Sequence, residues 1–133
     1  MEIYIVEDDI SVINVLEDII ESNGLGTVCG NSGGRPADPA EVARLNPDVV
    51  LVDFLMPEKD GIQFVRELKA AGSTARCIMI SQVSAKDLIG KAYSAGIDFF
   101  ISKPINIIEV KSVIENVERQ IQNERTLSNI RKM

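Results

Sequence analysis

The chain of 133 residues has no histidine and no tryptophan, and it contains only two cysteines. Without histidine, Ser-His-Asp and Cys-His catalysis, histidine-rich zinc sites and an internal phosphohistidine are excluded. Cys29 and Cys77 lack CxxC spacing and lie in strand-like sequence, so we expect both to be buried, reduced thiols. Any bound metal is therefore expected to be a hard cation held by oxygen ligands.

Long apolar runs are also missing, and the N-terminus leads directly into strand-like sequence without a signal-type segment. We therefore expect a cytoplasmic protein that does not enter a membrane. The formal net charge of −6 disfavours a general nucleic-acid surface, so we expect no DNA contact by this segment alone. The length fits one domain with an ordinary core.

Strand-like and helix-like segments alternate five times, a pattern typical of a parallel α/β sheet. The predicted strands cover residues 2–6, 25–30, 48–53, 76–81 and 97–102. The predicted helices cover residues 10–22, 39–45, 61–71 and 84–95, followed by a last helix that Asn106 and Glu109 cap and that continues toward Arg131. The third strand is a continuous apolar run of the kind that is buried on both faces.

The last predicted helix changes character along its length. Its first half carries an apolar stripe, which indicates a helix packed on the core. The stripe ends at Ile121, because Glu124 and Ser128 occupy the next positions. We expect a domain over residues 1–120 and an extension over 121–133, which is a linker helix, a short coiled coil to a second copy or a disordered end.

Chemically active side chains follow four of the predicted strands, where parallel α/β sheets gather their ligands. They are Glu7 and Asp8 after the first strand, Asp53 after the third, Ser81 after the fourth and Lys103 after the fifth. A desolvated strand-end carboxylate such as Asp53 can attack phosphorus and form an aspartyl-phosphate. Taken alone, the same aspartate is more typical of a helix cap or turn.

The neighbouring charges favour the phosphorylation hypothesis. Glu7 and Asp8 would bring further carboxylates beside Asp53, and their mutual repulsion favours a cation such as Mg²⁺. Asp9 is interpreted as an outer bystander or a helix N-cap. Lys103 would place an ammonium group across the site, able to bind a phosphoryl oxygen. Because Lys103 precedes Pro104, a cis bond there is a hypothesis for how the lysine is aimed.

Over residues 1–120, the chain resembles the receiver domain of bacterial two-component response regulators. The resemblance is carried by Glu7-Asp8, Asp53, Met56-Pro57, Asp60-Gly61, Ser81 and Lys103-Pro104. It implies a doubly wound, five-stranded parallel sheet, flavodoxin-like (βα)5, with strand order 2-1-3-4-5. It also implies a signalling switch rather than an enzyme, because such a domain catalyses only its own aspartyl phosphorylation and dephosphorylation. A sensor histidine kinase would supply the phosphoryl group.

The resemblance also assigns roles to individual residues. Asp53 would be the phosphoacceptor, while Ser81 and Lys103 would bind the phosphoryl group. Mg²⁺ would be held by Glu7, Asp8, Asp53 and the backbone carbonyl of Leu55, and no organic cofactor is implied.

In the family, the switch couples the serine, here Ser81, to an aromatic side chain on the fifth strand, here Phe100. Phe100 lacks the hydroxyl of the tyrosine often found there, and a simple core role for it stays open. Gln82 replaces a usually small residue, so we expect it either to narrow access to Asp53 or to form a hydrogen bond near the phosphoryl group. The output face implied is residues 84–118, the fourth helix, fifth strand and fifth helix, and a homodimer through it is expected by analogy.

Three other classes of protein fit less well. A haloacid dehalogenase-type phosphatase needs a second acid at the position of Leu55, and a P-loop enzyme needs Gly-Lys-Ser/Thr after its glycines. A flavin binder would have little for ring stacking, with only two tyrosines and no tryptophan.

Two receiver types stay open: a stand-alone receiver that acts by protein binding or phosphorelay, and the receiver of a transcription regulator that contacts DNA through a separate effector domain. Residues 80–83 and 103–106 loosely resemble receivers of glutamine-utilisation regulators.

Overall fold

The computed structural model describes residues 1–33, 35–82 and 86–132. The strands are β1 (Glu2–Val6), β2 (Thr27–Asn31), β3 (Val49–Asp53), β4 (Arg76–Ser81) and β5 (Ile97–Ser102). The helices are α1 (Ile10–Ser22), α2 (Pro39–Leu45), α3 (Gly61–Ala70), α4 (Lys86–Ala95) and α5 (Ile107–Arg131). Each strand precedes a helix, so the predicted alternation is confirmed.

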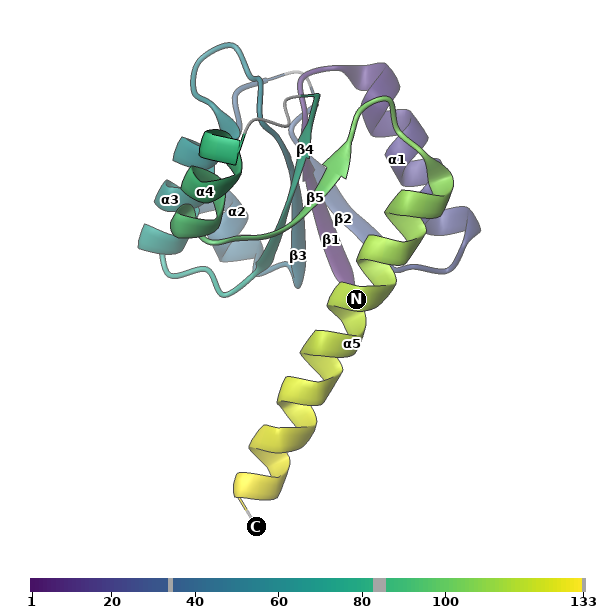
Figure 1. Ribbon diagram of the computed structural model, residues 1–133, viewed down its shortest axis with the longest axis vertical. Coiled ribbons are helices and arrows are strands. Elements are labelled where there is room, and N and C mark those ends of the chain that lie inside the picture. The colour runs from purple at the N-terminus through teal and green to yellow at the C-terminus, as the bar shows by residue number, and fades with distance from the viewer. Residues whose placement is uncertain (34, 83–85, 133) are drawn as a thin grey trace.

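The strands form one parallel sheet in the order β2-β1-β3-β4-β5, which confirms the predicted doubly wound fold (Figure 1). Helices α1 and α5 cover one face of the sheet, and α2, α3 and α4 cover the other. Each face has its own apolar core. β3 lies at the centre with all five of its residues buried, as its continuous apolar run predicts.

The helices on the two faces are anchored unequally. Helix α3 buries large side chains, among them Phe64 and Leu68, and α5 buries Val110, Ile114 and Val117. Among the residues of α4 with described side chains, only Ala92 and Ala95 are buried, and Leu88 packs partly against the same core. Helix α4 is therefore held to the sheet mainly by methyl groups.

Side-chain caps fix where several helices begin. The carboxylates of Asp9, Asp38 and Asp60 accept hydrogen bonds from backbone N–H groups of the first turns of α1, α2 and α3. Asn106 caps α5 in the same way, as predicted. The predicted reciprocal role of Glu109 is wrong, because its Oε1 accepts instead from the Ser102 N–H at 2.7 Å and ties the end of β5 to α5.

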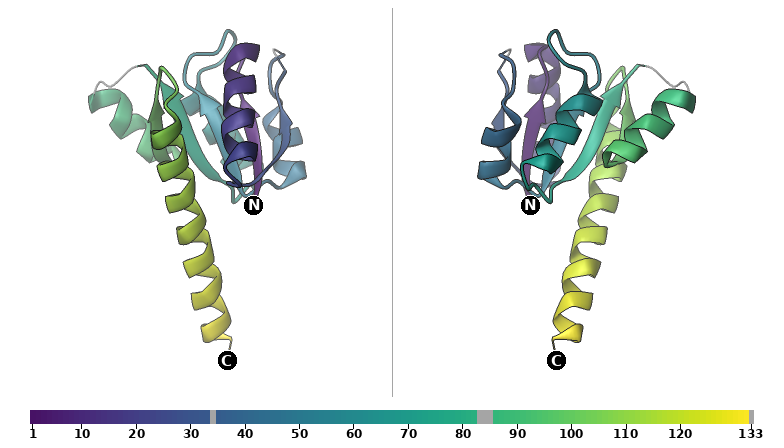
Figure 2. Two further views of the ribbon diagram at one scale, coloured as in Figure 1. Left: turned by 90° about the vertical axis from the view of Figure 1, so that its right-hand side faces the viewer. Right: turned by 90° about the vertical axis from the view of Figure 1, so that its left-hand side faces the viewer.

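Helix α5 runs without a break to Arg131 and extends beyond the sheet past the amino ends of the strands (Figure 2). Its 25 residues correspond to about 37 Å at about 1.5 Å per residue. The extension, whose state the sequence leaves open, is helical to Arg131, which suits either a linker helix or a coiled coil. None of the helices in the described ranges is both long and apolar enough to cross a membrane.

Two expectations need correction near the sheet edge. β2 begins at Thr27 rather than at residue 25 and alternates exposed with half-buried residues, because it is an edge strand. Cys29 is consequently exposed, contrary to the expectation of a buried thiol, whereas Cys77 on β4 is buried as expected. The predicted start of the fourth helix at Ser84 lies outside the described residues.

Candidate functional site

A pocket of about 260 Å³ opens at the carboxyl edge of the sheet, where β1, β3, β4 and β5 end. It brings together the residues predicted from the strand ends. Its lining consists of Glu7, Asp8, Asp9, Asp53, Leu55, Ser81, Gln82 and Lys103. The convergence follows from the parallel sheet, because every strand ends at the same edge.

Asp53 is the last residue of the central strand and only 3% exposed. Lys103 Nζ lies 3.3 Å from its Oδ1. Burial raises the pKa of the Asp53 carboxyl, while the charge of Lys103 and hydrogen bonds from its side chain oppose the change. The lysine therefore helps to keep a buried carboxylate ionised.

Backbone contacts around Asp53 restrict its position. The N–H of Phe54 donates to the carbonyl of Ile80 at 2.9 Å, and the N–H of Gly61 donates to the Phe54 carbonyl at 2.9 Å. A Cβ atom on Gly61 would lie 2.6 Å from the Asp53 carbonyl oxygen. Glycine is therefore required at position 61, where α3 begins beside the Asp53 backbone.

Glu7 is held by a contact that the sequence did not reveal. The Ser32 hydroxyl donates to the Glu7 carbonyl at 2.7 Å and accepts from the Glu7 N–H at 3.0 Å. Ser32 is 8% exposed and lies just after β2, 25 residues further along the chain. The only sequence signal was a serine within a glycine-rich loop, which is common without such a role.

The Glu7 carboxyl is buried beside Asp53. Burial first, and then the charge of Asp53, raise the pKa of Glu7 to about 7, against the attraction of Lys103. Glu7 Oε1 accepts from the Asp9 N–H at 3.2 Å. Glu7 Oε2 is buried and accepts no hydrogen bond from the described residues, although Lys103 Nζ lies 3.4 Å away.

The acidic residues fit a hard divalent cation. One carboxylate oxygen each from Glu7, Asp8 and Asp53 lie within 4.8 Å of one another. The unsatisfied Glu7 Oε2 and the all-oxygen donor set suit Mg²⁺, which binds a few carboxylates and keeps several waters. Asp8 is exposed, so one side of the group is open to water and to a substrate.

Lys103 follows β5, and the bond between Lys103 and Pro104 is cis, as hypothesised. The Lys103 N–H donates to the Ser81 carbonyl at 3.1 Å, which connects the ends of β4 and β5. Burial by itself would lower the pKa of Lys103, but the charges of Asp53 and Glu7 raise it above its ordinary value. The side chain is therefore a cation at neutral pH.

Ser81 and Gln82 occupy the wall of the pocket at the end of β4. Ser81 is 7% exposed, whereas the adjacent Gln82 is exposed at the mouth. Gln82 also lines a second hollow, formed with the first turns of α1 and with Lys103 and Pro104.

Phe100 is not among the residues that line the acidic pocket, within the described part of the chain. Its ring packs edge-on against Tyr93 of α4, with centroids 5.3 Å apart and an interplanar angle of 75°. The sequence did not identify Tyr93 as its partner. Phe100 is half-buried against the core cluster to which α4 contributes.

Comparison with known proteins agrees with this geometry. The family described as "Response regulator receiver domain" matches residues 3–115. The transcriptional regulatory protein GlnL of Bacillus subtilis is 38% identical over 98% of this chain, which spans 41% of that relative. The chemotaxis protein CheY of the same organism is 33% identical over 84% of this chain and 92% of its own length.

A solved structure supports the architecture. The chemotaxis protein CheY4 of Vibrio cholerae has a TM-score of 0.76 with this chain, at 18% identity, covering 87% of this chain and 97% of that one. At that identity the likeness shows the fold alone.

Proposed function

Because the chain belongs to the response regulator receiver domain family, whose members act in phosphorylation-dependent signalling, we propose that it is a switch with Asp53 as the phosphoacceptor. The observation that carries this proposal is the pairing of a buried strand-end carboxylate with a lysine 3.3 Å away. That arrangement suits nucleophilic attack on phosphorus, because the cation is placed to offset charge on the transferred group.

The proposed donor is the phosphohistidine of a sensor histidine kinase. An Asp53 carboxylate oxygen forms the bond to phosphorus while the bond from phosphorus to the imidazole nitrogen breaks, and the electron pair of that bond stays on the nitrogen. Lys103 and Ser81 bind oxygens of the transferred phosphoryl group. Hydrolysis later releases inorganic phosphate and restores the carboxylate, so no separate substrate is turned over.

Glu7, Asp8, Asp53 and the backbone carbonyl of Leu55 are the proposed Mg²⁺ ligands, directly or through water. Bound there, Mg²⁺ would offset the negative charge of the carboxylates and of phosphoryl oxygens. The contacts of Ser32 keep the Glu7 backbone in place for this role.

The proposed output surface is formed by α4, β5 and α5, corresponding to residues 84–118 apart from those not described. Phe100 and Ser81 are its proposed switch residues, and Tyr93 is the aromatic contact that a movement of Phe100 would change. Tyr93 and Ile108 are exposed by 53% and 77%, which leaves apolar side chains available on α4 and α5. These exposed groups support a homodimer or a protein partner at this face.

Two settings for the switch are supported by different relatives. The chain spans 41% of GlnL, which favours a receiver within a longer transcriptional regulator that contacts DNA through another domain. The chain spans 92% of CheY, which favours a stand-alone receiver that acts by binding proteins. We favour the first setting, because α5 continues well past the core, and we expect the switch to work in the cytoplasm.

Incubation with acetyl phosphate and Mg²⁺ tests the phosphoacceptor. We expect intact-protein mass spectrometry to detect one added phosphoryl group, labile to hydroxylamine, in the wild-type chain and none in Asp53→Asn. Asp60→Asn is a matched control, because asparagine also caps helices, and it should be modified like the wild type. Equal modification of Asp53→Asn, or no requirement for a divalent cation, would refute the proposal.

A further inference from the structure

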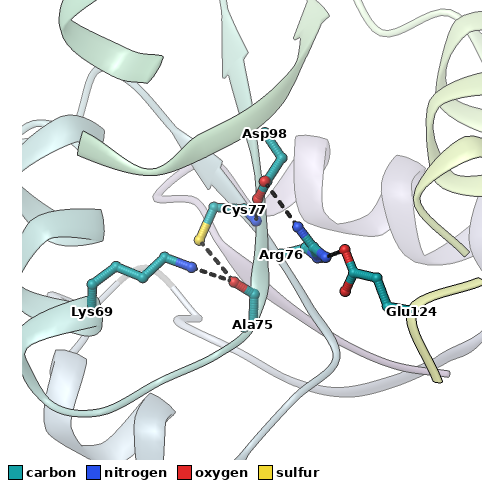
Figure 3. Close-up of polar contacts among 6 residues, drawn as sticks. All are labelled: Lys69, Ala75, Arg76, Cys77, Asp98 and Glu124. Atoms are coloured by element: carbon teal, nitrogen blue, oxygen red, sulfur yellow. Dashed lines mark hydrogen bonds and ion pairs between the residues drawn. The ribbon is translucent and has the colours of Figure 1, made fainter. Parts of the chain in front are cut away.

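Two adjacent residues of the α5 extension bind opposite charges at the amino edge of the sheet. Glu124 forms an ion pair with Arg76, the first residue of β4 (Figure 3). Arg125, the next residue of α5, has its Nη2 3.0 Å from Oδ1 of Asp48, just before β3. Both contacts lie at the end of the sheet opposite to the acidic pocket.

The two residues that receive the helix are themselves held in place. Arg76 Nη1 also donates to Asp98 of β5 at 3.4 Å, and the other oxygen of Asp98 accepts from the Cys77 N–H at 2.9 Å (Figure 3). Asp48 Oδ2 accepts from the Glu2 N–H at 2.7 Å, and its carbonyl accepts from the Arg76 N–H at 2.9 Å. The sheet therefore presents one cation and one anion at defined positions.

We propose that these two ion pairs, which have opposite polarity, form an electrostatic clamp that sets the rotation and direction of the α5 extension relative to the sheet. Glu124 faces a cation and Arg125 faces an anion, so only one order of charges along the helix is compatible with the sheet. If the helix turned by about one residue, or 100°, like charges would come together. The arrangement therefore specifies orientation as well as attachment.

In the α5 extension, ion pairing rather than apolar packing connects the helix to the sheet. The last fully buried side chain of α5 is Val117, and Ile121 packs only partly on the core. Beyond Ile121, α5 and the amino edge of the sheet line a polar groove of about 510 Å³ that includes Glu124, Arg125 and Ser128. Apolar packing thus gives way to charge pairing where the helix leaves the domain.

The clamp also determines which side of the extension faces outward. With about 3.6 residues per turn, Leu127 lies about 60° from Glu124 around α5, whereas Ile130 lies roughly opposite to both charged residues. Leu127 and Ile130 are 53% and 59% exposed. A fixed rotation keeps this pair of apolar residues in one direction relative to the receiver, whatever follows them in the chain.

Exchanging the two charges tests the clamp in the full 133-residue chain. The double variant Glu124→Arg with Arg125→Glu keeps composition and net charge but places like charges against Arg76 and Asp48. We expect amide hydrogen exchange in residues 122–131 to become at least about threefold faster, because exposed pairs are weak individually but two become repulsive. Residues of β3 and β4 should keep their protection.

The matched control uses the same dipeptide earlier in the same helix. Glu118→Arg with Arg119→Glu inverts an identical pair, whose side-chain hydrogen bonds within the described ranges are to Gln122 and Asn116 of α5 itself. Amide hydrogen exchange in residues 122–131 of this control variant should be as slow as in the wild type. The proposal would be overturned if the Glu124/Arg125 variant exchanged at the wild-type rate, or if the control accelerated exchange equally.

A double-mutant cycle isolates one pair from general effects on helix stability. Arg125→Gln and Asp48→Asn should each accelerate exchange, and their combination should add little, because either change alone removes the same contact. Asparagine retains an oxygen for the Glu2 N–H. About 1 M salt should accelerate exchange more in the wild type than in the Arg125→Gln/Asp48→Asn variant, which keeps only the Glu124–Arg76 pair. Fully additive effects would contradict a direct pair.

Discussion

The carboxyl group of Glu7 makes the acidic pocket sensitive to pH. The pKa of Glu7 is raised to about 7 in the folded protein, whereas an ordinary glutamate releases its proton near pH 4.5. Between these values the folded state binds more protons than the unfolded state. The contribution of Glu7 to the free energy of unfolding is therefore fully present below about pH 4.5 and is lost as the pH rises through about 7.

Replacing Glu7 by glutamine removes this titration. Without divalent cations, Glu7→Gln should stabilise the protein at pH 8, by about 2 kcal/mol relative to its effect at pH 5, because a buried charge is no longer formed. Urea unfolding at the two pH values measures the difference. If the effect of the substitution is the same at pH 5 and pH 8, Glu7 does not titrate in this range.

Gln82 is the polar side chain at the mouth of the pocket, and we expect it to hinder access to Asp53. Gln82→Ala should accelerate phosphorylation by acetyl phosphate, and hydrolysis of the product, by a few fold. Gln63→Ala, an exposed glutamine on α3, provides a control that should leave both rates unchanged. Equal rates for Gln82→Ala and wild type would remove Gln82 from the set of modulating residues.

Individual residues were predictable where the chain itself places them. Asp53, Ser81 and Lys103 follow apolar strands, and parallel strands end at one edge, so their convergence could be predicted before any geometry was known. Ser32 and Tyr93 were missed because their roles depend on which loop or helix packs beside Glu7 or Phe100. Neither contact leaves a periodic signal in the sequence.

Helix α3 begins at Gly61, where a Cβ atom would collide with the backbone of Asp53. Gly61→Ala would place a Cβ atom 2.6 Å from the Asp53 carbonyl oxygen, so we expect a loss of about 1 to 3 kcal/mol in the free energy of unfolding. Gly90→Ala in α4 is the control: its Cβ would have no described atom within 4 Å, and alanine should stabilise that helix by about 0.5 to 1 kcal/mol.

Urea unfolding of both glycine variants measures these effects, and opposite signs are expected. If both variants were destabilised equally, the close approach of residue 61 to Asp53 would not be the cause of the loss. Phosphorylation of Gly61→Ala should also slow, since the backbone beneath the acceptor must shift.

Elements with strong periodic patterns were predicted well, and elements defined by distant partners were not. The bounds of α1 and β5 agree with the sequence prediction because an N-cap or apolar run marks them. The state of α5 after Ile121 stayed open because Glu124 interrupts the apolar stripe. That interruption is explained by Arg76, which is 48 residues earlier in the chain and invisible to local patterns.

The molecule as a whole has two edges with proposed roles: the acidic pocket lies at the carboxyl ends of the strands and the proposed clamp at their amino ends. The proposed domain of residues 1–120 contains the first edge but lacks the residues of α5 that complete the second. A chain ending at residue 120 should fold cooperatively, because Val117 is the last fully buried residue.

We expect this truncation to lower the free energy of unfolding by about 1 to 2 kcal/mol, through loss of Ile121 packing and two ion pairs, and to leave the phosphorylation rate unchanged. Urea unfolding and acetyl phosphate labelling measure the two quantities. Full-length Ile121→Ala separates the apolar part of the loss from the ionic part. An aggregated or unfolded truncated chain would show that residues 121–133 belong to the domain.

The anchoring of α4 by alanines has an energetic consequence for the molecule. Apolar burial contributes about 0.8 kcal/mol per CH₂ group, so detaching a helix that buries Ala92 and Ala95 costs far less than detaching α3 with Phe64 and Leu68. Helix α4 also follows the strand that carries Ser81 and contacts Phe100 through Tyr93. This weakly anchored helix therefore adjoins the proposed switch, so we expect that a small free-energy change from one phosphoryl group would suffice to displace it.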